Sequence, residues 1–411
     1  MKTPLFSPDL ATLPPPDAEA RAHSEACAAL IRAEIAAAKG WISFARFMAL
    51  ALYAPGLGYY AAGARKFGAA GDFVTAPEIS PLFGQCIARS IADTVRETGG
   101  DVLELGPGSG KLACDVLLAL DALGALPERY CLLEVSADLK QRQQQALARL
   151  PSHLARRAVW LDTLPENFEG AIIANEVLDV VPVHLVTFTA GWVFERGVVV
   201  NAQNEFQWRD VPALPAALSQ VVSRIQAGFA ADLNEFNEPN DESTSSVPDG
   251  YLTEVAPAVE GLVASLAQCL QRGTILLIDY GFRHAEFYHA HRSTGTLMCH
   301  YRHYAHTDPF YLPGLQDITV HVDFTSVAAA AITAGLELIG YTSQAQFLLQ
   351  AGITELMAAY DPADASTYLP ITNQAQRLLS PAEMGEFFKV IGFAKGGVTI
   401  AALAQARPLP L

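Results

Sequence analysis

The chain has 411 residues, of which 51% are hydrophobic and 17% charged, so it has ample apolar material for a packed core and global disorder is excluded. Its 27 Lys and Arg against 43 Asp and Glu give a net charge of −16, and phosphate backbones would repel such a chain, which argues against a general nucleic-acid binder. No apolar run is long enough to span a bilayer, and prolines and acidic residues occupy the beginning of the chain, where a signal or transit peptide would lie. We therefore expect a soluble, cytoplasmic protein with no membrane insertion.

The first hundred residues predict helices around an irregular segment. A proline-rich arm (1–17) precedes an alanine-rich helix over 18–38, and a second helix runs from Ser43 toward Leu52. Residues 53–83 are dense in glycine and aromatic residues without a clear period, which predicts loops with short strands. A further helix is expected over 81–98.

Apolar strands then alternate with helices. We expect strands at 101–106, 130–135, 158–162, 170–176 and 273–281, and helices at 111–123, 137–150 and 257–271. A hairpin-like pair (184–200) and a polar loop (236–250) interrupt the series. The alternation predicts parallel strands joined by right-handed crossovers, and therefore a doubly wound α/β fold.

The segment 283–326 interrupts the alternation of strands and helices, which resumes after it. A helix over 323–334 and a strand at 336–342 are expected, followed by helices at 344–360 and 372–390 and a closing β-hairpin at 389–403. We divide the chain into an N-terminal extension (1–98), a core (99–282) with an insertion at 184–250, a further insertion (283–322) and the end of the core (323–411) with a helical insertion and the closing hairpin.

Metal binding has little support in this sequence. The six cysteines are scattered singly without a Cys-x-x-Cys pair, so we expect reduced, mostly buried thiols. The segment 283–326 carries seven of the ten histidines, but their spacing matches neither His-Glu-x-x-His nor a facial triad. We expect no metal site.

A glycine loop follows the first strand of the core. The phosphate-binding P-loop pattern fails, because Leu105 stands where its first glycine belongs and Leu112 replaces Ser or Thr. Gly108, Gly110 and Ala113 satisfy the dinucleotide fingerprint, which leaves a nicotinamide-dependent oxidoreductase as an alternative. An acid followed by three alternate glycines is typical of S-adenosylmethionine sites, and Glu104, Gly106, Gly108 and Gly110 match every position.

Polar residues at the ends of the next three strands also favour S-adenosylmethionine. Glu134 ends the second strand, where a carboxylate can accept both ribose hydroxyls, and Asp162 ends the third, where it can receive the adenine amino group. Asn175 and Glu176 end the fourth, beside the place where the methyl group emerges. Ligands of open α/β sheets bind at the carboxyl ends of the strands, so these residues are expected to meet.

The chain resembles the MidA-like family of class I methyltransferases, which includes the mitochondrial complex I assembly-factor methyltransferase. The shared segments cover most of the chain: GYY (58–60), GDFVTAPEISPLFG (71–84), LELGPGSG (103–110), NEVLDVVPVH (175–184), IDYG (278–281) and DITVHVDF (317–324). The resemblance implies a Rossmann-like core with an N-terminal extension and insertions, S-adenosyl-L-methionine as cofactor, and methyl transfer to an arginine of a partner protein such as a respiratory complex I subunit. The oligomeric state stays open, a homodimer included. A non-catalytic assembly scaffold that binds its partner through 283–326 remains an alternative.

The cofactor's methionine end is expected to contact the N-terminal extension. Thr75, Pro77 and Glu78 lie where the family's extension covers the cofactor, and the alternative is a proline-stopped turn before a helix cap at Ser80.

Carboxylates are the first candidates for the acceptor side. A guanidinium is protonated at neutral pH and must be oriented, which a fork of carboxylates does. Glu176 is the first choice, Asp179 is a second carboxylate or a structural cap, and Glu254 is a further candidate. His303 and His321 are candidates to line the substrate pocket or to take the released proton. Asp323 is a further candidate, with a helix-capping role as its alternative.

Overall fold

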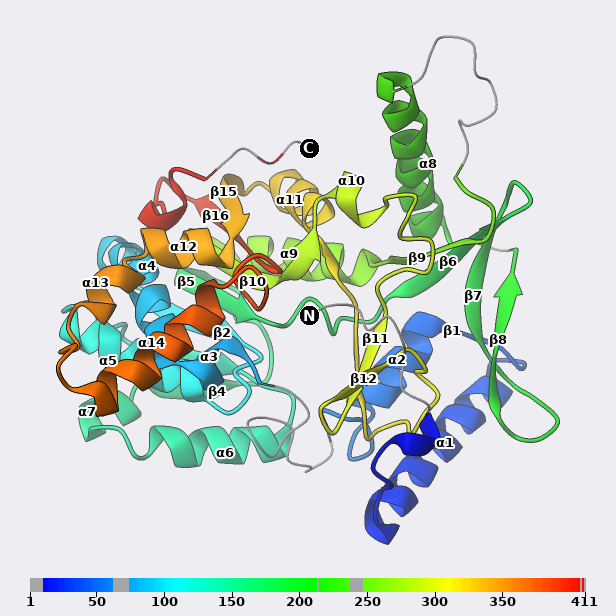
Figure 1. Ribbon diagram of the computed structural model, residues 1–411, viewed down its shortest axis with the longest axis horizontal. Helices are drawn as coiled ribbons and strands as arrows, with labels where there is room; N and C mark the ends of the chain where they lie inside the picture. Colours follow the sequence, from blue (N-terminus) through cyan, green and yellow to red (C-terminus); the bar gives the residue numbers. More distant parts are fainter. Residues whose placement is uncertain (1–9, 62–73, 213, 237–246, 407–408, 410–411) are drawn as a thin grey trace.

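The computed structural model describes residues 10–61, 74–212, 214–236, 247–406 and 409, and an eight-stranded sheet is the central layer of the part on the left in Figure 1. Across the sheet the strands are β15 (Glu337–Ser343), β16 (Phe388–Lys395), β10 (Leu270–Phe282), β5 (Phe168–Asn175), β2 (Asp101–Leu105), β3 (Tyr130–Leu133) and β4 (Ala158–Leu161), with β14 (Val322–Asp323) beside the end of β10. The strands from β10 to β4 are parallel, and β16 runs antiparallel to β10 and β15. This confirms the predicted doubly wound, mostly parallel α/β fold.

Helices cover both faces of this sheet. Val102 and Ile173 pack into the layer that holds α4 (Pro81–Thr98) and α5 (Lys111–Ala122), whereas their neighbours Leu103 and Ile172 pack into the layer of α9 (Pro257–Cys269) and α11 (Phe324–Thr333). Successive side chains of a strand point to opposite faces, so strands covered on both sides are apolar throughout. The apolar runs in the sequence therefore located these strands correctly.

The strand register brings the candidate site residues to one edge. Leu105 pairs with Leu133 and with Ala174, and Leu133 pairs with Leu161. The parallel strands consequently end at the same level, and the residues that follow each of them lie along a common edge.

A second sheet of five strands lies beside the first. Its strands are β1 (Ile42–Ser43), β7 (Trp192–Val200), β6 (His184–Thr189), β9 (Tyr251–Val255) and β8 (Phe206–Val211). α1 (Ala18–Ala37) and α2 (Phe44–Tyr53) pack on one face, and α8 (Ala216–Phe236) packs on the other. The hairpin predicted at 184–200 is confirmed by β6 and β7, whereas β8, β9 and α8 have no counterpart in the sequence analysis. Most of the polar loop predicted at 236–250 lies outside the described residues.

A third, small sheet occupies the segment that breaks the α/β alternation. It consists of β12 (Tyr304–His306), β11 (Met298–Tyr301) and β13 (Asp317–Thr319), and α10 (His284–Phe287) precedes it. Cys299 and Ile318 are fully buried in the same apolar cluster as Phe47 of α2, so the insertion is packed against the N-terminal extension.

The C-terminal region differs from the prediction. The helix expected at 344–360 is two helices, α12 (Gln344–Gln350) and α13 (Ile353–Met357), because Gly352 adopts a left-handed φ of 85° between them. The helix expected at 372–390 is wrong: α14 (Ala365–Leu379) begins earlier, after the Asp364 cap, and ends before Pro381. The closing hairpin at 389–403 is also wrong, since β16 is inserted between β10 and β15. Tertiary strand pairing overrides the local pattern here.

The remaining described elements are short or peripheral. They are η1 (Leu10–Thr12), α3 (Ala76–Ile79), α6 (Ala137–Leu147), α7 (Ser152–Ala155) and η2 (Ala401–Leu403). Of the segment 53–83, expected to hold loops with short strands, the described part holds turns and helices, and 62–73 lie outside it. Within the described part of the chain, no helix has the length and apolar character to cross a membrane.

Candidate active site

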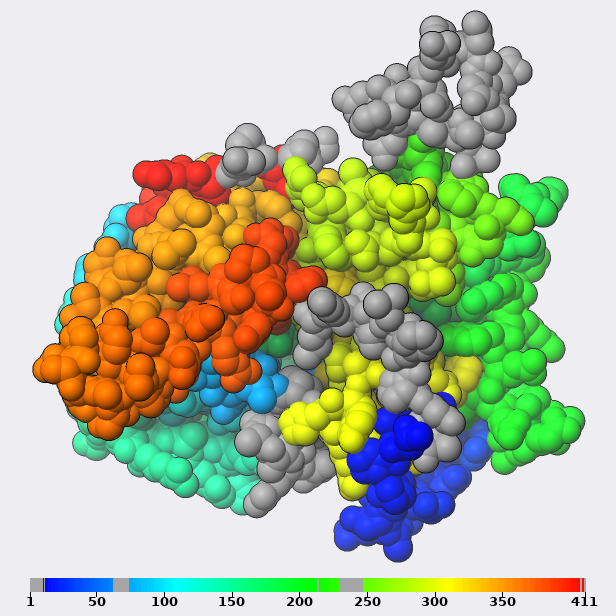
Figure 2. Space-filling model, in the orientation of Figure 1, coloured from blue at the N-terminus to red at the C-terminus, as the bar shows by residue number. Residues whose placement is uncertain are grey.

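A cavity of about 1280 Å³ lies at the carboxyl-terminal edge of the central sheet. Its lining includes the glycine loop, α3, the turn after β5, the end of β10, the third sheet, and the segment between α14 and β16, together with residues of the second sheet such as Arg196, Trp208 and Glu254. Figure 2 shows α14 and the segment after it (orange) on one side of this region and the third sheet (yellow) on the other. The N-terminal extension, the core and the 283–322 insertion therefore all contribute to one site.

The glycine loop has the backbone conformation that its sequence predicts. Gly106, Gly108 and Gly110 have φ values of 57°, 52° and 81°, in the left-handed region that favours glycine. Gly106 and Gly108 line the cavity. Gly110 does not, but a Cβ on it would lie 3.2 Å from Gln143 Cα, so α6 packs directly against the loop.

The extension closes on this loop through α3. Thr75, Pro77 and Glu78 all line the cavity, and the Ser109 hydroxyl of the glycine loop donates a hydrogen bond to the Glu78 carboxylate. Ser80 caps α4 by accepting the Leu82 N–H, so the capping alternative for this segment holds as well. The two interpretations are compatible.

Glu134 is a buried carboxylate held by its surroundings. It is 6% exposed, its Oε1 accepts the Ser136 N–H at 2.8 Å, and its Oε2 accepts Gln143 Nε2 at 3.0 Å. Gln143 also donates to the Gly108 carbonyl at 2.9 Å and accepts Trp160 Nε1 at 2.9 Å. Gln143 is not predicted from the sequence, because its position depends on how α6 packs against the loop. This network fixes the carboxylate relative to the glycine loop.

Of the two other acids at the ends of the strands, Glu104 lies in the site and Asp162 does not. Glu104 lines the cavity, is 2% exposed and accepts the Tyr130 hydroxyl at 2.6 Å. Burial raises its pKa to about 7. The Asp162 side chain is 89% exposed, pairs with Lys140 Nζ at 2.7 Å and is not part of the cavity lining, so its expected place facing adenine is not found.

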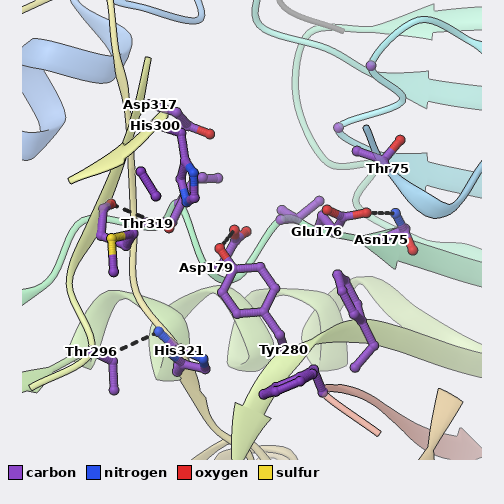
Figure 3. Close-up of a pocket in the computed structure, with 18 of the residues that line it drawn as sticks. Thr75, Asn175, Glu176, Asp179, Tyr280, Thr296, His300, Asp317, Thr319 and His321 are labelled. Carbon is purple, nitrogen blue, oxygen red and sulfur yellow. Dashed lines mark hydrogen bonds between the residues drawn. The ribbon is translucent and has the colours of Figure 1, made fainter. Parts of the chain in front are cut away.

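The turn after β5 carries the acceptor-side candidates (Figure 3). Asn175, Glu176 and Asp179 line the cavity, and Asn175 Nδ2 donates to Glu176 Oε1 at 3.1 Å. Glu176 has a left-handed φ of 53°, a strained conformation for a residue with a Cβ. Burial, reinforced by the charge of Asp179, raises the pKa of Glu176 to about 8. Burial likewise raises the pKa of Asp179 to about 6.

Glu254 and the two candidate histidines differ in their surroundings. Glu254 lines the cavity, where its Oε1 accepts the N–H groups of Thr296 and Leu297 at 2.7 and 2.9 Å. His321 lies between Phe282 and Tyr280, each with ring centroids 5.1 Å away, and burial lowers its pKa to about 3. His303 has a φ of 67° in the exposed turn between β11 and β12, at the rim of the cavity.

Asp323 has a structural position and lies outside the cavity. Its Oδ1 accepts the N–H groups of Thr325 and Ser326, and its Oδ2 lies 3.0 Å from His284 Nδ1. These contacts cap α11, so the expected catalytic role is not supported and the capping alternative is the correct one.

Two further carboxylates belong to this region. Asp317, 2% exposed, lines the cavity and accepts the Tyr60 hydroxyl at 3.1 and 3.0 Å. Asp279 is fully buried beneath the turn after β5. Both lie in segments that carry the family resemblance, which is the only sign of them in the sequence.

These residues fit S-adenosylmethionine. The left-handed glycines allow close approach of the backbone, Glu134 offers a fixed acceptor for hydroxyl groups, and Glu104 adds a carboxylate for a cationic ligand. Together with the strand order, they define a class I S-adenosylmethionine-dependent methyltransferase with a Rossmann-like core.

Comparison with known proteins supports the same class of enzyme. Residues 86–342 match a family of S-adenosyl-L-methionine-dependent methyltransferases. The mitochondrial protein arginine methyltransferase NDUFAF7 homolog of Drosophila melanogaster is 30% identical, with 93% of this chain and 88% of the homolog covered. The Danio rerio NDUFAF7 is also 30% identical, with 87% and 85% covered. The chain belongs to the MidA-like family of S-adenosylmethionine-dependent methyltransferases that includes NDUFAF7.

Two solved structures from Burkholderia thailandensis are also similar over nearly the whole chain. They are 47% and 45% identical, with TM-scores of 0.88 and 0.85, and each comparison covers 96% of this chain and 98% of the other. One of them is bound to S-adenosyl-homocysteine. S-adenosylmethionine is therefore the cofactor, and the nicotinamide alternative is withdrawn.

The comparisons contradict the expected cytoplasmic location. The relatives from Drosophila melanogaster, Danio rerio and Homo sapiens are all mitochondrial proteins. The expectation rested on charge and on the first residues of the chain, and neither property encodes the compartment in which a folded domain works.

Replacing Glu134 by alanine is expected to weaken binding of S-adenosyl-homocysteine, measured by calorimetry. A hydrogen bond to a charged acceptor contributes roughly 1.5–3 kcal/mol, so losing one should lower the affinity by at least about tenfold. Asp101→Ala is the matched control, because Asp101 is a buried carboxylate at the opposite end of β2, paired with Arg129. Equal affinities for Glu134→Ala and the wild type would remove Glu134 from the cofactor site.

Proposed function

We propose that this methyltransferase transfers a methyl group to an arginine of a partner protein, with a respiratory complex I subunit as the first candidate. The observation that carries the proposal is the acidic acceptor side of the cavity, lined by Glu176, Asp179 and Asp317. In the described part of the chain, no Lys or Arg forms an ion pair with Glu176 or Asp179. Two buried carboxylates, Glu176 and Asp179, that form no ion pair with Lys or Arg of the described residues suit a cationic acceptor. The names of the NDUFAF7 relatives support the same acceptor.

The residues would divide the work between cofactor and acceptor. The glycine loop, Glu104 and Glu134 would hold the cofactor, which supplies an electrophilic methyl group on its sulfonium. Glu176 and Asp179 would orient the guanidinium, which remains protonated because its pKa exceeds about 12. Positioning and fixed charges account for most of the catalysis in such a site.

The proton lost on methyl transfer would go to a carboxylate. His321 is a candidate to take it or to line the substrate pocket, but burial lowers its pKa to about 3, which makes it a weak base. Glu176, whose pKa is raised to about 8, is better matched to the task. We assign His321 to the aromatic wall beside Tyr280 instead.

Radiolabel transfer followed by mass spectrometry tests this function. The purified protein and S-adenosylmethionine with a labelled methyl group are added to an extract of cells that lack the gene, and the labelled protein is digested and sequenced. We expect the label on arginine. A label on lysine or glutamine would reject the arginine acceptor, and the absence of any transfer would favour the non-catalytic scaffold.

A further inference from the structure

Two consecutive residues of β10 hold the turn that carries the acceptor-side carboxylates. Asp279 is fully buried, and its Oδ2 accepts the backbone N–H groups of Val177, Leu178 and Asp179 at 3.1, 2.9 and 3.2 Å. Its neighbour Tyr280 donates its hydroxyl to Oδ2 of Asp179. Asp279 thus fixes the backbone of the turn, and Tyr280 fixes the side chain that the turn presents.

This arrangement leaves one oxygen of Asp179 available. The side chain is 4% exposed, and its Oδ1 is buried without a hydrogen-bond partner among the described residues. Leaving a carboxylate oxygen buried and unsatisfied is costly. Figure 3 shows Asp179 between Glu176 and the side chains of the third sheet, next to Tyr280. An N–H group from a ligand in the cavity would satisfy this oxygen.

We propose that Asp179 Oδ1 accepts a hydrogen bond from the acceptor's guanidinium group, and that Asp279 and Tyr280 are positioning residues that aim this oxygen. The proposal deepens and rests on the proposed function, because it assumes a cationic acceptor. It separates two tasks on one turn: Asp179 binds the acceptor through a fixed oxygen, and Glu176, at the strained position next to β5, receives the proton.

The groups around Asp179 set its pKa, and this pKa sets the pH above which Asp179 is ionised and can bind a cation. Among the described residues, the titratable groups around it include Glu176 on its own turn, Asp279 and Tyr280 of β10, Asp317 of β13, and Tyr53 and Tyr60 of the N-terminal extension. Burial raises the pKa of Asp179, while the hydrogen bond from Tyr280, and after it the backbone N–H groups of Asp179 and Val180, lower it. Removing that hydroxyl should raise the pKa, so cation binding in the variant should begin only at a higher pH than in the wild type.

The test uses ethylguanidinium as a probe of the acceptor site in the full chain saturated with S-adenosyl-homocysteine. Calorimetric titrations compare the wild type with Tyr280→Phe, Asp179→Asn and Tyr130→Phe. Tyr130→Phe is a matched comparison, since Tyr130 also donates its hydroxyl to a buried carboxylate in the cavity, that of Glu104. We expect Tyr280→Phe to weaken ethylguanidinium binding about tenfold, the scale of one hydrogen bond to a charged group, and Asp179→Asn to weaken it more. Tyr130→Phe should weaken binding of S-adenosyl-homocysteine instead.

The outcomes separate the two proposals. Unchanged ethylguanidinium binding in Asp179→Asn, or no binding to the wild type, would overturn the assignment of Asp179. A tenfold loss in Tyr280→Phe without the shift to higher pH would overturn the positioning role, because that loss would then come from packing alone. If ethylammonium binds as tightly as ethylguanidinium and responds to the same variants, Asp179 remains the cation-binding residue while the arginine acceptor is rejected.

Discussion

Gly108→Val is expected to abolish binding of S-adenosyl-homocysteine. Gly108 lines the cavity with a φ of 52°, and a β-branched residue is a strained outlier there. The added branches would also stand where the backbone must approach the cofactor. Because the Gly108 carbonyl accepts Gln143 Nε2 at 2.9 Å, a displaced loop would release the side chain that fixes Glu134. We expect a loss of at least about 10³-fold in affinity, equivalent to about 4 kcal/mol.

Gly124→Val separates this effect from backbone strain. The glycine loop precedes α5, and Gly124 follows the C-terminal end of the same helix. Its φ of 63° is similar to that of Gly108. A Cβ added there meets no heavy atom within 4 Å, and the residue lies outside the cavity lining. Both variants should lose stability to thermal unfolding, but only Gly108→Val should lose the ligand in a calorimetric titration. Normal binding by Gly108→Val would show that the loop does not hold the cofactor.

The sequence located the glycine-loop half of the cavity, where we expect the cofactor, because the ends of parallel strands lie along one edge of the sheet. Strands buried on both faces are apolar throughout, so the first polar residue marks their end, and the register of Leu105, Leu133 and Leu161 brings those ends to one level. Glu104 and Glu134 are placed in the cavity as predicted. Asp162 is at the predicted strand end but outside the lining, because the pattern does not fix a side-chain direction and Lys140 of α6 pairs with it.

The sequence also placed Glu176 and Asp179 in the cavity, but it did not predict the side chains that hold the site residues in position, because these depend on contacts between distant segments. Gln143 reaches Glu134 only when α6 packs against the glycine loop, and Tyr280 reaches Asp179 from a strand about a hundred residues later. Local patterns carry no information on such pairs. The same limitation explains the wrong helix at 372–390, where pairing with β10 and β15 makes residues 388–395 a strand.

Glu176→Gln is expected to lower kcat by about 10²–10³, the scale found for the loss of one preorganised electrostatic group. The substitution keeps the size of the side chain and an oxygen that can accept the Asn175 amide, while removing the negative charge. Affinity for S-adenosyl-homocysteine should be unchanged, because we expect Glu134 and the glycine loop to supply that binding. Glu195→Gln is the matched control: Glu195 is 2% exposed in β7, accepts a hydrogen bond from His184 and lies outside the cavity lining.

The pH dependence of the reaction gives a second test of Glu176. Because the pKa of this carboxyl is raised to about 8, the fraction that is ionised increases as the pH approaches 8. If the ionised form orients the acceptor and takes its proton, kcat/KM of the wild type should rise as the pH increases toward the Glu176 pKa of about 8. The rise should be absent in Glu176→Gln, and a wild-type rate for this variant on its natural partner would refute the assignment.

Thermal unfolding of Glu176→Gln tests whether the Glu176 carboxylate serves the reaction or stabilises the fold. The folded state of the wild type keeps the Glu176 proton between the ordinary pKa of 4.5 and about 8, whereas the unfolded chain releases it. The folded state therefore binds more protons in this interval, and its stability falls as the pH rises through it. Glu176→Gln lacks this proton uptake, so its Tm should exceed that of the wild type at pH 9 and approach it near pH 5. A carboxylate kept for stability would give the opposite sign, because its loss would destabilise the protein most at high pH, where it is ionised.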